Sequence, residues 1–167
     1  MWFEDEARFG QKSTLTKVWA RKGSRPTMMN QSEYGNIHVV AAACPETGQA
    51  EATCASKLNS GTMSEFLTQL GQRISSDKHV FLILDRASYH RSKSLKIPSN
   101  VKIVHLPPYS PELNPIENLW HYLRSHCWSN RIYKDAKALY QAAEDGWNSV
   151  CLKPGKVKTI CAVHYVH

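Results

Sequence analysis

The alternation of apolar and polar residues along the chain predicts a β-sheet with helices packed against it. Five consecutive apolar residues at Val80–Leu84 predict a strand that is buried on both faces in the middle of the sheet. The turn Pro45-Glu46-Thr47-Gly48 separates two partly alternating segments and predicts a hairpin. The further predicted strands are residues 1–6, 15–20, 36–44, 49–55 and 101–106.

Apolar residues at helical spacing predict three longer helices, at about residues 63–74, 115–127 and 134–150. Residues 88–96 are compatible with a short helix or a loop, and the basic tail after Pro154 is compatible with a short closing helix. The resulting order of elements predicts an α/β fold. Its mixed central sheet has about five strands, the first three antiparallel, and helices flank both faces.

Residues 107–120 combine a rigid loop with a helix start. Prolines at positions 107, 108 and 111 interrupt any regular element, and Asn114-Pro115-Ile116-Glu117 then predicts an N-cap, a first helical residue and an acid in the first turn. Two interpretations of Glu117 stay open: a capping box in which its side chain reaches back to the Asn114 amide, or a rigidly held metal ligand. The choice depends on whether other carboxylates converge on Glu117.

Asp5 and Asp85 are the acids that the predicted topology can bring to Glu117. Asp85 directly follows the predicted central strand, where ligand sites of open α/β sheets gather, although a turn or helix-capping role is the alternative. The first strand lies naturally beside the central one, which places Asp5 near Asp85. Three carboxylates in one cleft repel each other, and divalent cations remove that repulsion. Hard oxygen ligands favour Mg²⁺ or Mn²⁺, and two such ions roughly 3.5–4 Å apart suit phosphoryl transfer.

Composition points to one globular domain with a nucleic-acid partner. The chain has 167 residues, is 42% hydrophobic, and carries a formal net charge of +7. This length supports a sizeable core, and the positive charge favours a polyanion as partner. Because no apolar run is long enough for a membrane span and the N-terminus lacks the pattern of a signal peptide, we expect a soluble protein inside the cell, cytoplasmic and associated with the nucleoid.

The basic residues are concentrated in two segments without acids, between Glu6 and Glu33 and between Asp85 and Glu112. Each segment begins beside a candidate metal ligand, which is the pattern expected for phosphates lying across a small acidic centre; ordinary solvated surface is the alternative. The residues expected to contact DNA are Arg8, Lys12, Arg21, Lys22, Arg25, Arg86, Arg91 and Lys93, with His121 and Arg124 on the helix face beside Glu117.

The remaining candidates for chemistry are cysteines, histidines and a tryptophan. Five cysteines without a close pair are expected to be reduced and mostly buried. The candidates for a structural zinc site are Cys151, Cys161, His164 and His167. Such a site is disfavoured because the spacing of these residues fits no standard zinc-binding pattern. His90 is expected near Asp85 and a phosphate, or as an ordinary hydrogen-bonded histidine. Trp120 is expected in the core rather than on DNA, since its neighbours are apolar.

Four segments of the chain resemble, in order, the signature blocks of bacterial insertion-sequence transposases of the mariner superfamily. They are Asp5–Gly10, Val18–Ala20, Leu84–His90 and Leu106–Trp120, and the last is the most specific. The resemblance extends from residue 1 to about residue 150 and covers the catalytic domain. It implies a ribonuclease-H-like fold, a DDE-type triad at Asp5, Asp85 and Glu117, and Mg²⁺ or Mn²⁺, two ions per site. It also implies DNA cleavage by water and strand transfer by a 3′-hydroxyl into a target, usually TA.

Two departures from the family pattern change the expected function. The family commonly has Asn directly after the second Asp, whereas this chain has Arg86, whose cation could pair with Asp85 and compete with a metal. The family's N-terminal helix-turn-helix domains, which recognise transposon ends, are absent from residues 1–167, so we expect a single catalytic domain with largely non-specific, salt-sensitive binding to double-stranded DNA. A homodimer is also expected.

Two other functions remain compatible with the sequence. The first is a stand-alone nuclease on the same scaffold, which preference for an RNA–DNA hybrid over duplex DNA would favour. The second is a catalytically decayed remnant that binds DNA or a partner without chemistry, and Arg86 is the residue that supports it. Absence of Mn²⁺ binding would distinguish the remnant from the transposase domain.

Overall fold

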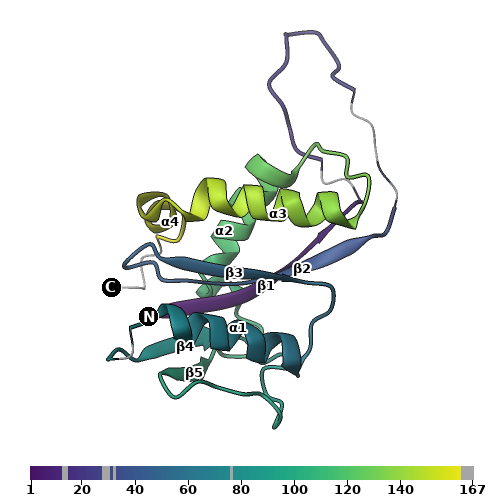
Figure 1. Ribbon diagram of the computed structural model, residues 1–167. Helices are drawn as coiled ribbons and strands as arrows, with labels where there is room; N and C mark the ends of the chain where they lie inside the picture. Colours follow the sequence, from purple (N-terminus) through teal and green to yellow (C-terminus); the bar gives the residue numbers. More distant parts are fainter. Residues whose placement is uncertain (13–14, 28–30, 32, 76, 163–167) are drawn as a thin grey trace.

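The strand β1, Trp2–Gly10, is the middle strand of a five-stranded sheet in a computed structural model of the chain (Figure 1). The structure describes residues 1–12, 15–27, 31, 33–75 and 77–162. The strand order is β3-β2-β1-β4-β5. The other strands are β2 Asn36–Ala43, β3 Ala50–Ala55, β4 Val80–Leu84 and β5 Val101–His105.

The direction of the strands decides where the candidate acids lie. β1, β2 and β3 are antiparallel neighbours, with Asp5 opposite Ala41, whereas β4 runs parallel to both β1 and β5. Because β1 and β4 point the same way, the second half of β1 and the residue after β4 approach the same edge of the sheet. The predicted mixed sheet, with its first three strands antiparallel, is therefore confirmed.

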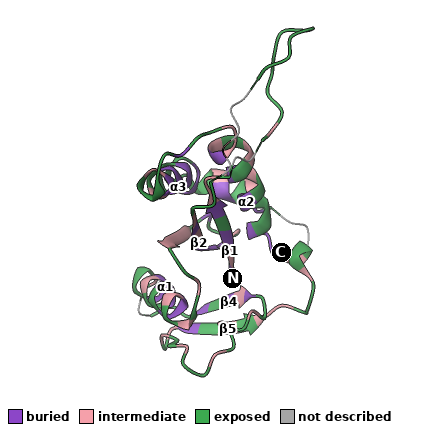
Figure 2. Cartoon of the chain, turned by 90° about the vertical axis from the view of Figure 1, so that its right-hand side faces the viewer, coloured by how far each residue is buried: buried purple, intermediate pink, exposed green. Residues whose placement is uncertain are grey.

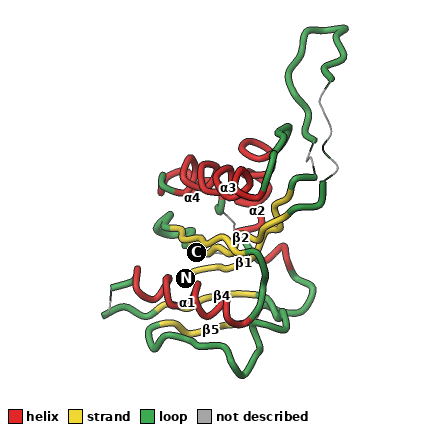
Figure 3. The backbone as a smooth tube through the Cα atoms, turned by 45° about the vertical axis from the view of Figure 1, so that its right-hand side comes forward, coloured by secondary structure: helices red, strands yellow, loops and turns green. Residues whose placement is uncertain are grey.

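Helices cover both faces of this sheet, giving three layers (Figures 1 and 3). Helix α1 lies on one face, and helices α2, α3 and α4 lie on the other. Their bounds are α1 Ser60–Arg73, α2 Ile116–Leu123, α3 Ala136–Cys151 and α4 Pro154–Ile160. A 3₁₀ turn, η1 Pro111–Leu113, precedes α2, and a π-helical turn, η2 Arg124–Trp128, follows it.

The two faces of β1 carry different side chains because strand residues alternate. Ala7 and Phe9 belong to the core beneath α2 and α3, where Phe9 stacks on Trp128 with ring centroids 4.7 Å apart. Trp2 belongs to the core beneath α1. Asp5 shares the parity of Ala7 and Phe9, and its neighbours in sequence, Glu4 and Glu6, share the parity of Trp2.

Several predicted elements are confirmed with adjusted ends, and three details are wrong. β1 continues to Gly10, beyond the predicted end at residue 6, because Ala7 and Phe9 extend the buried alternation. Residues 15–20 form no strand; Thr16 is hydrogen-bonded to Ser129 and Asn130, and the chain beyond it forms an extended excursion that leaves the body of the molecule (Figure 2). β4 has one open face, since Phe81 is 49% exposed. Residues 88–96 form turns and loop, and the short closing helix is present as α4.

The last part of the predicted helix 115–127 is a π-helical turn rather than α-helix. The cysteines at all five positions are unbridged; His164 and His167, which the disfavoured zinc site would need, lie outside the described residues. Within the described part of the chain, no helix combines the length and the hydropathy needed to cross a bilayer.

Candidate active site

Asp5, Asp85 and Glu117 line one cleft with a volume of about 580 Å³. Asp5 comes from the middle of β1, Asp85 follows the last residue of β4, and Glu117 lies in the first turn of α2. The parallel pairing of β1 with β4 brings the two aspartates to the same region, and α2 adds the glutamate from the sheet face on which Asp5 lies.

Asp5 is held by the core and repelled by its neighbour. The indole Nε1–H of Trp120 donates to Asp5 Oδ2 at 3.0 Å, and Trp120 itself is fully buried. Burial, followed by the negative charge of Glu117, raises the pKa of Asp5 from 3.8 to about 7. The influence of Glu117 on this pKa shows that the two carboxylates are electrostatically close.

Asp85 is oriented through one of its oxygens. Its Oδ1 accepts the Ala87 backbone N–H at 2.7 Å and lies 2.8 Å from His90 Nδ1. No hydrogen bond from the described residues reaches Oδ2, and the side chain is 58% exposed. One oxygen therefore fixes the carboxylate while the other remains available to a ligand.

The environment of Asn114 tests the capping-box interpretation of Glu117. The Asn114 backbone N–H donates to Pro111 O at 2.9 Å, so it is not available to the Glu117 side chain, and the capping-box interpretation is wrong. The Asn114 Oδ1 accepts the Ile116 N–H at 3.3 Å, while its Nδ2 donates to Glu4 O in β1 at 2.8 Å. Asn114 thus joins the start of α2 to the strand that carries Asp5.

The residues of this cleft fit divalent cations that prefer oxygen ligands. All three candidate ligands are carboxylates, and burial together with the charge of Glu117 raises the pKa of Asp5, which a bound cation would lower again. Among the described residues, the group of three with ligand atoms within 4.8 Å of one another is Glu4, Glu6 and His90, so the donors of the cleft are spread more widely. Mg²⁺ keeps several water ligands and is usually bound by only one or two carboxylates, so the three side chains need not all contact one ion.

Arg86 does not make the predicted pair with Asp85. Its Nε donates to the Leu106 carbonyl at 3.0 Å, and the described ion pair of Asp85 is with His90. Arg86 and Arg91 both line the cleft and are exposed, which places two cations beside the carboxylates.

The other residues expected to contact DNA are all exposed, but the structure spreads them over several surfaces. Arg21, Lys22 and Arg25 belong to the excursion of residues 15–27 (Figure 1). The rest are distributed as Arg8 on β1, Lys12 just after it, Lys93 in the loop after β4, His121 on α2, and Arg124 at the start of η2. Trp120 is in the core, as expected.

Sequence reasoning missed the acids behind His90. His90 is 3% exposed, and its Nε2 lies 2.9 Å from Glu6 Oε1 and 3.4 Å from Glu4 Oε2. Burial alone lowers the pKa of His90, but hydrogen bonds to Glu6 and Asp85 outweigh burial and raise it. The available signal was the alternation along β1, which places residues 4 and 6 on the face opposite to residue 5.

A mixed sheet with this order, flanked by helices and with three acids at one cleft, defines a ribonuclease-H-like catalytic domain of the DDE type. The family model of the DDE superfamily endonucleases matches residues 1–140, so the chain belongs to this family. A crystal structure of the Mos1 mariner paired end complex with Mn has the same fold, with a TM-score of 0.70 at 13% sequence identity.

Two relatives are similar to this chain in sequence, and one of them comes from an insertion element. The uncharacterized protein y4pE/y4sA of Sinorhizobium fredii (strain NBRC 101917 / NGR234) is 34% identical over 130 residues, which is 78% of this chain and 96% of that protein. The insertion element IS630 uncharacterized 39 kDa protein of Shigella sonnei is 22% identical over 127 residues, which is 74% of this chain and 37% of that protein. The match to Mos1 covers 96% of this chain and 51% of the Mos1 chain. The chain thus spans about half or less of the IS630 and Mos1 proteins.

Proposed function

We propose that this domain cuts and joins DNA strands in the transposition of an insertion sequence, with Asp5, Asp85 and Glu117 as its metal-binding catalytic residues. The observation that supports this most directly is the single cleft lined by all three carboxylates, in a chain of the DDE superfamily endonucleases. The presence of Mn in the Mos1 paired end complex supports Mg²⁺ or Mn²⁺ as the cofactor here. We propose two ions per site, as suits an in-line displacement at phosphorus.

Each side chain of the cleft has a distinct task in this proposal. Bound divalent ions would activate the attacking oxygen and stabilise the leaving oxygen at the scissile phosphate. The Trp120 N–H holds one oxygen of Asp5, and the Ala87 N–H and His90 hold one oxygen of Asp85. These contacts fix both carboxylates before DNA binds, as efficient catalysis of phosphoryl transfer requires.

Duplex DNA, as transposon ends and as a target that we expect to be TA, is the proposed substrate. The exposed Arg86 and Arg91 beside the carboxylates would contact phosphates and position the strand. In this proposal the domain acts as a homodimer at the nucleoid, since pairing of two transposon ends needs two active sites. The Mos1 paired end complex supports such an assembly.

A plasmid-nicking assay with Mn²⁺ tests the proposal. Glu117→Gln removes one ligand charge, and we expect nicking to fall at least about 100-fold, the usual effect of losing a group that stabilises transition-state charge. The matched control is Glu65→Gln, the same change at an exposed acid of α1 outside the cleft, which should nick like the unmodified protein. Circular dichroism checks that both variants are folded. Equal nicking by the two variants would refute the triad.

A further inference from the structure

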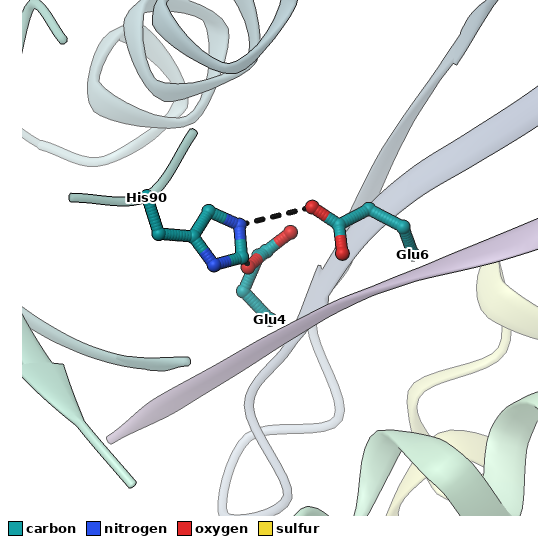
Figure 4. A group of neighbouring side chains, drawn as sticks. All are labelled: Glu4, Glu6 and His90. Atoms are coloured by element: carbon teal, nitrogen blue, oxygen red, sulfur yellow. Dashed lines mark hydrogen bonds and ion pairs between the residues drawn. The ribbon is translucent and has the colours of Figure 1, made fainter. Parts of the chain in front are cut away.

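Glu4, Glu6 and His90 form a second cluster of ligand-type side chains (Figure 4). Strand alternation places Glu4 and Glu6 on the opposite face of β1 from Asp5. One ligand atom from each residue lies within 4.8 Å of the other two. All three side chains are buried, with exposures of 0% for Glu4, 7% for Glu6 and 1% for His90. This cluster is therefore an enclosed site rather than a group of surface acids.

Glu4 is the side chain that the rest of the fold leaves unexplained. Neither of its oxygens accepts a hydrogen bond from the described residues, and its nearest nitrogen, His90 Nε2, is 3.4 Å away. Burying a carboxylate without partners is strongly unfavourable, and Glu6 adds a second negative charge close by. A positively charged occupant would remove this penalty.

The orientation of His90 suits a metal ion as that occupant. Its Nδ1 lies 2.8 Å from Asp85 Oδ1 and its Nε2 lies 2.9 Å from Glu6 Oε1, so without an ion Nε2–H can donate to Glu6. When an ion replaces the Nε2 proton, Nδ1–H still donates to Asp85 and the Nε2 lone pair points toward the two glutamates. A histidine that donates one ring N–H to a carboxylate while its other nitrogen binds a metal is a common arrangement in metalloproteins.

The separations within the cluster also match those of ligands around one ion. Nε2 is 2.9 Å from Glu6 Oε1 and 3.4 Å from Glu4 Oε2. Two ligands that are each about 2.1 Å from an ion have these separations when the angle between them is roughly 90–110°, as in tetrahedral or octahedral coordination.

We propose that Glu4, Glu6 and His90 bind a divalent transition-metal ion of the Zn²⁺ or Mn²⁺ type, in a buried site separate from the cleft of Asp5, Asp85 and Glu117. Two carboxylate oxygens and one imidazole nitrogen are a ligand set for these ions. The two positive charges balance Glu4 and Glu6. Through the hydrogen bond between His90 and Asp85, the bound ion would also fix the orientation of a residue of the cleft.

The ligand types allow the two sites to be distinguished without measuring activity. The cleft offers carboxylate oxygens, whereas the proposed site includes a histidine nitrogen. Pulsed electron paramagnetic resonance of Mn²⁺, added to protein that has been stripped with a chelator, detects a coordinated nitrogen through its hyperfine coupling. We expect this coupling in the unmodified protein and in Glu117→Gln, which alters only the cleft.

Variants of the cluster complete the experiment. Glu4→Gln should weaken the nitrogen-coupled Mn²⁺ at least about tenfold, since even partners of metal ligands change affinity by this amount. His90→Gln should abolish the nitrogen coupling, because it removes the coordinated nitrogen. Glu4→Gln has nearly the same shape as the native side chain and removes a buried charge, so it should fold even if His90→Gln does not.

The proposal is overturned if saturating Mn²⁺ shows no nitrogen coupling in the unmodified protein. A proton shared within the cluster, rather than a metal ion, would then stabilise the buried glutamates. It is also overturned if the coupling persists in Glu4→Gln at unchanged affinity. Neither result depends on whether Glu117→Gln abolishes nicking, so failure of this proposal is separate from failure of the proposed function.

Discussion

Asp5 belongs to the core and to the cleft at the same time. Its Oδ2 accepts a hydrogen bond from the fully buried Trp120, which favours the ionised carboxylate. Burial and the charge of Glu117 favour the protonated form, and they outweigh the hydrogen bond because the pKa rises to about 7. A cation bound beside Asp5 would lower its pKa, so the protonation state of Asp5 reports on metal binding.

The stability of the metal-free protein should fall as the pH rises from about 4 to 7, the range between the ordinary and the raised pKa of Asp5. In this range folded Asp5 keeps a proton that unfolded Asp5 has lost, so the folded state binds more protons and rising pH favours unfolding. The raised pKa of His90 acts in the same direction. Urea denaturation at a series of pH values, with a chelator present, measures this slope.

Two comparisons make the pH dependence specific to Asp5. Asp5→Asn should flatten the slope, whereas Glu65→Gln, at an exposed acid of α1, should leave it unchanged. Mg²⁺ at about 100 times its dissociation constant should add about 2.7 kcal/mol to the free energy of unfolding. A slope that is as steep in Asp5→Asn as in the unmodified protein would contradict this assignment.

At the scale of elements, the start of α2 is positioned by a contact to β1 in addition to the local contact between Asn114 Oδ1 and the Ile116 N–H. Asn114 is 5% exposed, and its Nδ2 donates to Glu4 O across 110 positions in the sequence. Because Glu117 follows three residues later, this hydrogen bond sets the distance between the helix that carries Glu117 and the strand that carries Asp5.

Asn114→Ala should therefore lower both stability and metal affinity. We expect a loss of about 1–3 kcal/mol in the free energy of unfolding, since the substitution leaves a buried carbonyl without its donor. Mn²⁺ binding to the cleft should weaken because Glu117 is no longer held, and a calorimetric titration measures it.

The control is Asp135→Ala, which removes the N-cap of α3. The Asp135 side chain accepts the Ala138 N–H at 2.7 Å. This control should cost about 1 kcal/mol without affecting Mn²⁺ affinity; equal Mn²⁺ affinity in both variants would be inconsistent with a positioning role for Asn114.

The sequence predicted the elements well where burial follows a simple period. The strand at Val80–Leu84 and the helix α1 were both predicted to within a few residues. Each of these elements buries most of its apolar side chains against the sheet or a single layer of helix, so the period of its apolar residues matches the element. The failure at residues 15–20 has the opposite cause: Trp19 is fully exposed, so its β propensity meets no neighbouring strand.

The candidate site was predictable only in part, for a geometric reason. Sequence order and strand direction are enough to predict that Asp85 lies near Asp5. In the structure both residues line the same cleft. The role of His90 depends on where a loop after β4 folds back, which no periodicity encodes. Its contacts with Glu6, 84 positions away, become visible only in three dimensions.

At the scale of the whole molecule, positive charge is distributed far beyond the cleft. The net charge is +7, yet the cleft itself contains three of the acids. Arg21, Lys22 and Arg25 lie on the excursion of residues 15–27, which leaves the body of the molecule (Figure 1). A basic segment that extends in this way can contact phosphates at a distance from the scissile one, adding affinity without altering the chemistry.

Neutralising this segment should weaken DNA binding and its dependence on salt together. In the triple variant Arg21→Gln, Lys22→Gln, Arg25→Gln, the slope of log K against log salt should become shallower by about 0.9 for each phosphate contact that is lost. Fluorescence anisotropy with a labelled duplex, at salt concentrations from about 50 to 200 mM, measures this slope. Mn²⁺ binding to the cleft should stay unchanged, because the substituted residues do not line it.

A second triple variant separates contact with DNA from net charge. Lys78→Gln, Lys153→Gln, Lys158→Gln removes the same charge from exposed positions just before β4 and around α4. If affinity follows net charge alone, the two triple variants will lose equal affinity and equal slope, and the excursion has no special role. A larger loss in the first variant means that the excursion of residues 15–27 lies on the DNA, since the two proteins have the same net charge and differ in where that charge was removed.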